Sequence, residues 1–160
     1  MLLVAVDIEG CAGVVCAEAA SLAKRLGEEA VLCTCVQPPD GLTWGAPLHG
    51  ELEGRTVEEA LVADATQELE ALAKGFETPV SVRVLEGPPV ESVIGLAEEL
   101  TPSMVVLGTH GRKGLARWFQ GSVAEEILRR SHWPVHIVPG GDVLPHPTAV
   151  RTQLDVETEG

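Results

Sequence analysis

The segment MVVLGTHG at residues 104–111, followed after nine residues by GSVAEEILRR at residues 121–130, decides the fold. The first segment is a short apolar run that stops at a glycine, which is typical of a buried strand ending in a turn. The second segment predicts a helix. A strand, a turn and a helix in this order indicate an α/β fold.

The glycines and the serine of this stretch predict a seat for phosphate groups. Gly108, Gly111 and Gly121 carry no side chain, so the backbone there can approach an anion closely and adopt positive φ. Ser122 and Glu125 have the S-x-x-E spacing of a capping box, which indicates a helix N-terminus. Free backbone N–H groups and the helix dipole favour a bound anion at such a terminus.

The charge distribution favours the same interpretation. The chain has a formal net charge of -13 and 24 acidic residues, yet none of these falls within residues 101–124. That stretch contains Arg112, Lys113 and Arg117 instead. A solvated basic loop is the alternative, and the glycine spacing favours the phosphate site over it. The overall acidity argues against nonspecific binding to nucleic acid or to an anionic membrane, because both require clustered basic residues.

Strand-like and helix-like patterns alternate along the whole chain. This alternation predicts a parallel sheet with right-handed crossovers and helices on both faces. A glycine- and proline-rich stretch over residues 40–54 predicts a long loop. The predicted strands cover residues 2–6, 30–36, 80–85, 104–107 and 135–138. The predicted helices cover residues 13–26, 56–74, 90–100 and 121–130.

Length and composition agree with one domain that has a proper core. Of the 160 residues, 45% are apolar and only 3% aromatic, so we expect a core of Val, Leu, Ile and Ala. No apolar run approaches the roughly 18 residues of a membrane span, and no basic leader precedes the first strand, so we expect a cytoplasmic protein. The cysteines, none in a C-x-x-C pair, indicate reduced thiols, and Cys33 and Cys35 should share one face of a strand. The cysteines are Cys11, Cys16, Cys33 and Cys35.

The composition changes after Pro139, which divides the chain into a domain of residues 1–139 and an extension of residues 140–160. Within the extension, apolar and polar residues alternate over residues 150–156, which is the period of a strand with one buried face. Two interpretations stay open. The extension is an extra edge strand, paired within the chain or exchanged with a partner, or it is a disordered tail.

Two common nucleotide motifs, G-x-x-x-x-G-K-[ST] and G-x-G-x-x-G, are absent from the sequence. Instead, Gly108-Thr-His-Gly111, nine residues and Gly121-Ser122 resemble the ATP-binding signature of the universal stress protein family. The opening LLVAVD and the closing SHWPVHIVP are similar to that family as well. The resemblance implies a Rossmann-like (HUP-type) three-layer α/β sandwich with a five-stranded parallel sheet of order 3-2-1-4-5. In that order the chain reverses its direction between strands one and four, where open α/β sheets bind ligands.

The resemblance also implies the residues of a nucleotide site. Asp7 has an alternative, structural role, because a carboxylate at a strand end can bond neighbouring loop amides. His110 can equally be a solvated loop residue. Glu9 departs from the small serine-containing turn of many members and adds negative charge, which phosphate-bound Mg²⁺ would offset. The implied adenine- and ribose-side residues are Ala5, Val6, Asp7 and Val36, the last through its backbone. The implied ribose- and phosphate-side residues are Leu107, Gly108, His110, Gly111, Arg112, Gly121, Ser122, Val123 and Ala124.

Together these features predict an ATP-binding regulatory module of the stress response, with ATP and phosphate-bound Mg²⁺ as ligands. Members of the family commonly dimerise through the last strand, so Val135–Val138 implies a homodimer, and a higher oligomer stays open. A slow ATPase or phosphotransferase is one alternative, in which Arg112 and Lys113 supply charge, although no residue is marked as a dedicated catalytic base. A nucleotide-free dimeric scaffold is the other alternative, and the intact glycine pattern argues against it.

Overall fold

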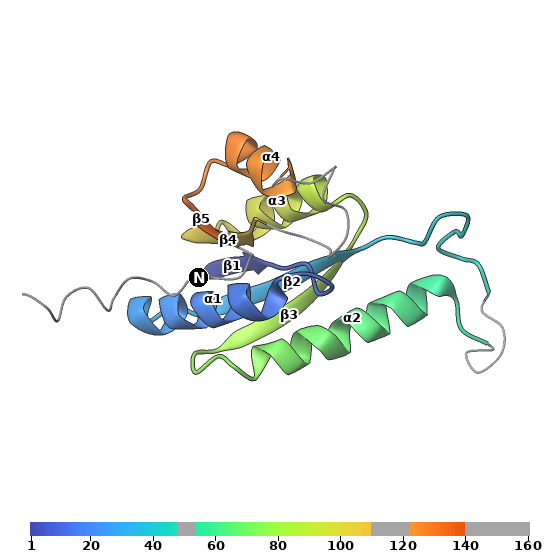
Figure 1. The fold of residues 1–160 in the computed structure, drawn as a ribbon, viewed down its shortest axis with the longest axis horizontal. Coiled ribbons are helices and arrows are strands. Elements are labelled where there is room, and N and C mark those ends of the chain that lie inside the picture. The colour runs from blue at the N-terminus through green and yellow to red at the C-terminus, as the bar shows by residue number, and fades with distance from the viewer. Residues whose placement is uncertain (48–53, 110–121, 140–160) are drawn as a thin grey trace, which may run out of the picture.

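The computed structural model describes residues 1–47, 54–109 and 122–139. Within these residues, five strands alternate with four helices (Figure 1). Each predicted element is present, and its ends differ from the predicted ones by at most one residue. The strands are β1 (Leu2–Ala5), β2 (Ala30–Val36), β3 (Val80–Glu86), β4 (Met104–Gly108) and β5 (Val135–Val138). The helices are α1 (Ala12–Leu26), α2 (Val57–Ala73), α3 (Pro89–Leu100) and α4 (Ser122–Arg130).

The strands form one parallel sheet in the order β3-β2-β1-β4-β5. This observation confirms the α/β fold with strand order 3-2-1-4-5. The central strand is β1, whose Ala5 lies opposite Cys33 of β2 on one side and Leu107 of β4 on the other. Because β1 and β4 are neighbours in the sheet but distant in the sequence, the winding of the chain reverses between them.

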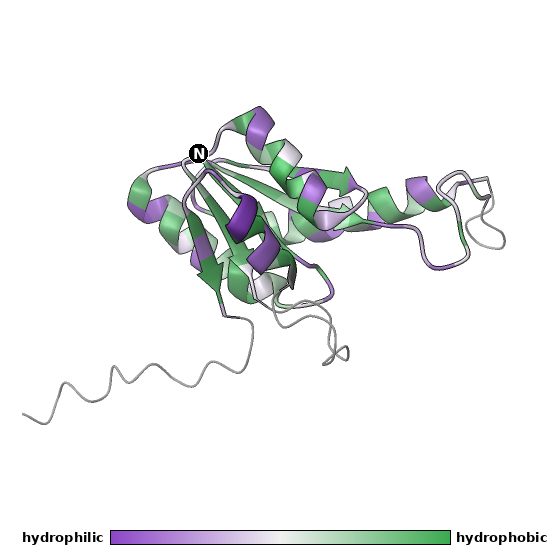
Figure 2. Cartoon of the chain, turned by 90° about the horizontal axis from the view of Figure 1, so that it is seen from above, coloured by the Kyte–Doolittle hydropathy of each residue, from purple (hydrophilic) through white to green (hydrophobic). Residues whose placement is uncertain are grey.

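Helices cover both faces of the sheet, which gives three layers (Figure 1). On one face α1 packs on β1 and β4 and α2 packs on β2 and β3, whereas α3 covers the opposite face of β2 and β3 and contacts α4. Alternate residues of β1 serve the two faces: Leu2 and Val4 lie in the core on the α1 side, and Leu3 lies in the core on the α3 side. Accordingly, the strands are largely hydrophobic and the helices have mixed hydropathy (Figure 2).

Aliphatic side chains and cysteines form both cores, as the low aromatic content predicts, and no aromatic residue in the described part of the chain is buried. The four cysteines form no disulfide bond within the described residues. Cys33 and Cys35 both lie in or against the core on the α3 side, which confirms that they share a face. Burial raises the pKa of Cys16 and of Cys35 to about 11, and it also raises the pKa of Cys33. These three thiols are therefore neutral near pH 7.

Local sequence explains where the helices begin and end. Thr56 caps α2, because its hydroxyl accepts a hydrogen bond from Glu59 N at 3.2 Å while the Glu59 carboxylate accepts one from Thr56 N at 2.8 Å. Gly27 ends α1 in the left-handed conformation with φ 66°. Pro89 begins α3, where the helix needs no N–H donor.

Residues 37–47 of the loop between β2 and α2 extend past the carboxyl end of β2, together with the first turns of α2 (Figure 1). Its described part is fastened to the helix, since Val57 N donates to Ala46 O at 2.9 Å. The extension of residues 140–160 lies outside the described residues, so both interpretations of it stay predictions. No helix in the described part combines the length and the apolarity that a bilayer-spanning segment needs.

Candidate functional site

The carboxyl ends of β1 and β4, with the residues that follow them, are here called the switch point. Ala5 and Leu107 are paired in the register of the two strands. From β1 the chain continues into α1 on one face of the sheet, and from β4 it continues towards α4 on the other face (Figure 1). Open α/β sheets bind their ligands at such a point, which makes it the first candidate for a site.

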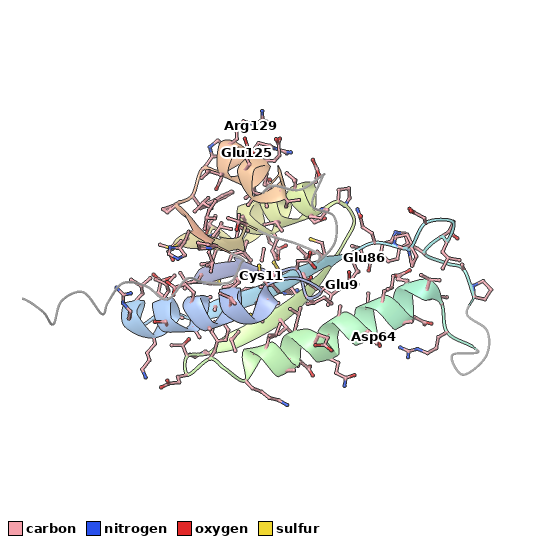
Figure 3. All side chains as sticks on the ribbon, in the orientation of Figure 1. Glu9, Cys11, Asp64, Glu86, Glu125 and Arg129 are labelled. Atoms are coloured by element: carbon pink, nitrogen blue, oxygen red, sulfur yellow. The ribbon has the colours of Figure 1, made fainter. Side chains whose placement is uncertain are left out.

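The turn after β1 is built around Asp7. One carboxylate oxygen of Asp7 accepts a hydrogen bond from Glu9 N at 3.1 Å, and the Asp7 carbonyl accepts one from Gly10 N at 3.0 Å. The structural role considered for this carboxylate is therefore present. A carboxylate has lone pairs for several donors, so this role is compatible with a contact to a ligand. Glu9 and Cys11 follow on the same turn (Figure 3).

Thr34 fixes the end of β1 from the neighbouring strand. Its side chain is 2% exposed, and its hydroxyl donates a hydrogen bond of 2.8 Å to the Val6 carbonyl. Val6 N in turn donates to Cys33 O at 2.9 Å. The sequence interpretation missed Thr34, although a single hydroxyl within the apolar run AVLCTCV at residues 30–36 was a signal. Through Val6, Thr34 sets the position from which the Asp7 turn starts.

Val36 ends β2 beside the switch point, and its side chain is 8% exposed. Its carbonyl accepts a hydrogen bond of 3.1 Å from Gly87 N in the turn after β3. Gly87 has φ 112°, which only glycine adopts without strain. A carbonyl oxygen has two lone pairs, so this bond is compatible with the backbone contact to a base that was expected of Val36.

Gly108 ends β4, and packing rather than backbone conformation requires a glycine there. A Cβ atom on Gly108 would lie 2.6 Å from Cys11 Sγ and 2.9 Å from Val15 Cγ2. Positive φ occurs at other described glycines and not at Gly108. Gly108 therefore does not use the positive φ that a glycine allows; a side chain is excluded there because the start of α1 occupies its space. Beyond Gly108, Thr109 N donates to Val138 O at 3.0 Å.

The first turn of α4 begins at Ser122 and includes Glu125. Ala124 is 5% exposed and lies in the core on the α3 side, and Val123 is half-buried against the same core. These two side chains face the protein interior, so they can serve a ligand only through their backbone N–H groups. The first N–H groups of a helix have no partner within the helix, which makes this turn a potential donor set for an anion.

Several predicted site residues lie outside the described residues: His110, Gly111, Arg112 and Gly121, together with Lys113 and Arg117. Their roles stay predictions. The structure places the remaining ones on the ends of three adjacent strands and on the first turn of α4. Ala5 ends β1, Val6 and Asp7 follow it, Val36 ends β2, and Leu107 and Gly108 end β4.

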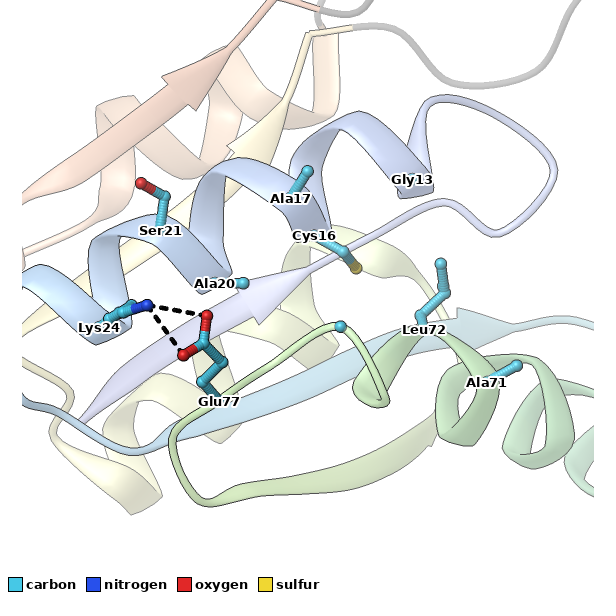
Figure 4. A pocket seen from close by; sticks show the side chains of 10 residues that line it. Gly13, Cys16, Ala17, Ala20, Ser21, Lys24, Ala71, Leu72 and Glu77 are labelled. Atoms are coloured by element: carbon cyan, nitrogen blue, oxygen red, sulfur yellow. Dashed lines mark hydrogen bonds and ion pairs between the residues drawn. The ribbon is translucent and has the colours of Figure 1, made fainter.

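A groove of about 560 Å³ lies between α1 and the end of α2, and its lining includes none of the predicted site residues (Figure 4). Its α1 wall consists mainly of small residues, and Lys24 Nζ joins the two walls by an ion pair of 2.8 Å with the Glu77 carboxylate. Both partners are largely exposed, so the pair adds little stability. Within the described residues, no group of three or more His, Cys, Asp or Glu side chains is arranged to hold a metal ion.

A family model described as the universal stress protein family matches residues 1–139 of this chain. Universal stress protein MJ0531 of Methanocaldococcus jannaschii is 31% identical over 97 residues, which cover 59% of this chain and 56% of that protein. Universal stress protein Rv2005c of Mycobacterium tuberculosis is 36% identical over 108 residues, which cover 66% of this chain and 34% of that protein. The chain thus spans about half or less of the length of these relatives.

Solved structures share the fold over most of the chain. Hypothetical protein MJ0577 superposes with a TM-score of 0.67 at 22% identity and covers 88% of this chain and 96% of its own. A universal stress protein in complex with cAMP superposes with a TM-score of 0.59 at 21% identity, and the match covers 88% of this chain and 96% of that one. The universal stress protein from Archaeoglobus fulgidus in complex with dAMP superposes with a TM-score of 0.53 at 20% identity, and the match covers 85% of this chain and 94% of that one. Similarity at these identities establishes the fold.

Proposed function

The chain belongs to the universal stress protein family, and from that premise we propose that it binds ATP with phosphate-bound Mg²⁺ at the switch point. The observation that carries the proposal is the pairing of Ala5 with Leu107, which brings the ends of β1 and β4 together where the winding of the chain reverses. Two structural relatives are complexes with cAMP and dAMP, which are adenine nucleotides. ATP has the same base and a phosphorylated sugar.

In this proposal the base and the sugar contact the residues after β1 and β2. Val36 offers its backbone to the base, since its side chain is nearly buried. The Asp7 carboxylate accepts hydrogen bonds from the sugar hydroxyls. The same carboxylate accepts the hydrogen bond from Glu9 N that organises the turn. Ala5 and Val6 form the floor between these two contacts, because they continue β1 up to the turn.

The phosphates contact the end of β4 and the start of α4. Leu107 and Gly108 lead into the turn, and the backbone N–H groups of Ser122, Val123 and Ala124 donate to phosphate oxygens at the helix N-terminus. The proposal adds His110, Gly111, Arg112 and Gly121 to this set. Mg²⁺ on the phosphates would offset the carboxylates of Asp7 and Glu9, and it would supply no further chemistry.

We further propose that the chain acts in the cytoplasm as a homodimeric regulatory module of the stress response, with β5 at the interface. β5 pairs with β4 alone among the described strands, and its residues Val135, His136 and Ile137 are only half-buried. An edge strand with apolar side chains tends to pair with another segment or chain, because its outer backbone groups are unpaired within the sheet. Sedimentation of the full chain should give a dimer, and removal of residues 140–160 should change the association if the extension covers β5. A monomeric full chain would contradict the proposed dimer.

The binding proposal is tested by calorimetry on ligand-free protein with Mg-ATP. Val123→Pro removes one N–H donor in the first helical turn, where proline is tolerated, and should weaken Mg-ATP binding about tenfold, because a hydrogen bond to a charged group is lost. Val123→Ala is the matched control, since it shortens the same side chain but keeps the N–H group, and should bind Mg-ATP like the wild type.

Absence of heat with folded wild-type protein would contradict the proposal, as would equal affinities of the Val123→Pro and Val123→Ala variants. Sustained release of ADP in the same samples, above roughly 1 per second, would favour the phosphoryl-transfer alternative over a regulatory ligand.

A further inference from the structure

We propose that Cys11 is a positioning residue for the phosphate part of the nucleotide site, because its side chain holds the end of β4 in place through Gly108. This inference deepens the proposed function and rests on it. It predicts that the size of the side chain at position 11 sets the affinity for phosphorylated adenine ligands, although the thiol itself does not contact the phosphates.

The space for a side chain at Gly108 is tighter than at the other glycines of the described helices and strands. A Cβ atom on Gly108 would lie 2.6 Å from Cys11 Sγ and 2.9 Å from Val15 Cγ2, distances at which something must shift. At Gly13 in α1 and at Gly95 in α3, an added Cβ would meet nothing within 4 Å. The thiol of Cys11 therefore fills the place that a side chain at position 108 would need.

The helix side of this contact is firmly held. The Cys11 carbonyl accepts hydrogen bonds from Val14 N and Val15 N, both at 3.1 Å. Val15 is 1% exposed and belongs to the core on the α1 side. The start of α1 is thus fixed by its own first turn and by the core, so the helix resists displacement.

The strand side is held less firmly. The register of β1 with β4 ends at the pair Ala5 and Leu107, so among the described strands the end of β4 pairs only with β5, through Gly108 with Val138 and the bond from Thr109 N to Val138 O. A larger side chain at position 11 or 108 would consequently move the end of β4 rather than the start of α1. The proposed function assigns Leu107 and Gly108 themselves to the phosphate side, so such a movement displaces part of that site.

A purely structural role of the contact makes a different prediction. Loss of packing alone would lower stability and would change the affinities for adenosine and for ATP by the same factor, through the fraction of folded protein. A positioning role instead changes the ratio of the two affinities. Adenosine depends on Asp7 after β1 and on Val36 at the end of β2, whereas the phosphates of ATP depend on the end of β4.

The first test compares adenosine and Mg-ATP binding by calorimetry on variants shown to be folded by circular dichroism. Gly108→Ala should weaken Mg-ATP binding about tenfold, equivalent to about 1.4 kcal/mol, and adenosine binding by less than about threefold. Gly95→Ala is the matched control, because it adds the same methyl group in open space. It should change neither affinity.

The second test varies the size of residue 11. Cys11→Ser is close in volume and should keep the wild-type ratio of Mg-ATP to adenosine affinity, whereas Cys11→Leu should lower that ratio about tenfold. The double variant C11A/G108A should recover at least about threefold of the Mg-ATP affinity that Gly108→Ala loses, because Sγ is gone. The remaining contact with Val15 Cγ2 at 2.9 Å prevents full recovery.

Equal losses of adenosine and Mg-ATP affinity in the Gly108→Ala variant, or no recovery in the double variant, would overturn the inference. If Gly108→Ala does not fold, the comparison of Cys11→Leu with Cys11→Ser decides, and equal ratios would overturn it. A folded wild type that binds neither ligand would contradict the proposed function itself. A wild type that binds Mg-ATP, with Cys11→Leu binding equally well, would contradict only the role of Cys11.

Discussion

At the amino end of the sheet, hydrogen bonds join the starts of neighbouring strands, whereas at the carboxyl end they hold the turns that follow the strands. At the amino end, Leu2 N donates to Glu29 O at 2.8 Å and Ser103 N donates to Met1 O at 2.9 Å. At the carboxyl end, Gly87 N donates to Val36 O at 3.1 Å and Thr109 N donates to Val138 O at 3.0 Å. The bonds at the amino end join neighbouring strands to one another, and the bonds at the carboxyl end position the residues around the switch point.

This difference separates stability from ligand chemistry. Bonds at the amino end involve no residue assigned to the nucleotide, so changes there should alter the free energy of unfolding alone. Bonds at the carboxyl end involve Val36 and Thr109, which flank the switch point, so changes there should alter both stability and affinity. Parallel α/β folds in general place chemistry at the carboxyl ends of their strands.

Alkaline pH should give the largest effect, and it acts through the cysteines of α1 and β2. Cys16 and Cys35 have a pKa of about 11 in the folded chain, raised by burial from an ordinary value of 9.0. Below pH 9 these thiols are neutral in both states, and their contribution to stability is fully present. Between pH 9 and 11 only the unfolded chain ionises. The free energy of unfolding should therefore fall by about 1.4 kcal/mol per pH unit for each thiol.

Denaturant unfolding at pH 7, 9 and 10.5 measures this slope. The double variant C16A/C35A should be less stable at pH 7, because packing is lost, but its stability should fall less steeply above pH 9. The chain contains no tyrosine, so tyrosine ionisation does not contribute to the slope. A slope that is unchanged in the double variant would show that these thiols ionise equally easily in the folded and unfolded chains.

The fold was predictable from local pattern, but the strand order was not. β1 and β2 are buried on both faces, so β1 is an uninterrupted apolar run and β2 is apolar except for Thr34. β3 alternates instead, with Ser81 and Arg83 exposed and Val82 half-buried, because it is an edge strand. A period of two is the same wherever a strand lies in a sheet, so the order 3-2-1-4-5 came from the family resemblance and not from periodicity.

The candidate site shows the same limit. The glycine spacing marked Gly108, but the reason for the glycine is its contact with Cys11 and Val15, residues far away in the sequence. Thr34 stood out only as a hydroxyl in an apolar run, and its partner Val6 lies 28 residues away. Tertiary packing creates both contacts, and a single sequence carries no local signal for either.

Thr34→Val should give an intermediate effect at the carboxyl end. The substitution keeps the shape of the side chain but removes the 2.8 Å hydrogen bond to the Val6 carbonyl in a buried position. We expect the free energy of unfolding to fall by about 1 kcal/mol. The Mg-ATP affinity should fall by about threefold, because the turn that contains Asp7 starts directly after Val6. Thr34→Ser keeps the hydroxyl and should preserve the affinity. Equal affinities of the Thr34→Val and Thr34→Ser variants would remove Thr34 from the determinants of the switch point.

Ser103→Ala should give the smallest effect, and it acts at the amino end. The Ser103 hydroxyl donates to Met1 O at 2.9 Å and also bonds the Glu28 carboxylate, but the side chain is exposed. The midpoint of thermal unfolding should fall by less than about 3 °C, and the Mg-ATP affinity should stay unchanged.

The N-terminal amine and the Ser103 hydroxyl hold the pKa of Glu28 below its usual range, so nuclear magnetic resonance should show that pKa rising in the variant. Ser103 and Thr34 share no hydrogen-bond partner, so their losses in the free energy of unfolding should add in the double variant S103A/T34V. The Mg-ATP affinity of the double variant should fall only as much as that of Thr34→Val alone. A lower affinity in Ser103→Ala alone would break the separation between the two ends of the sheet.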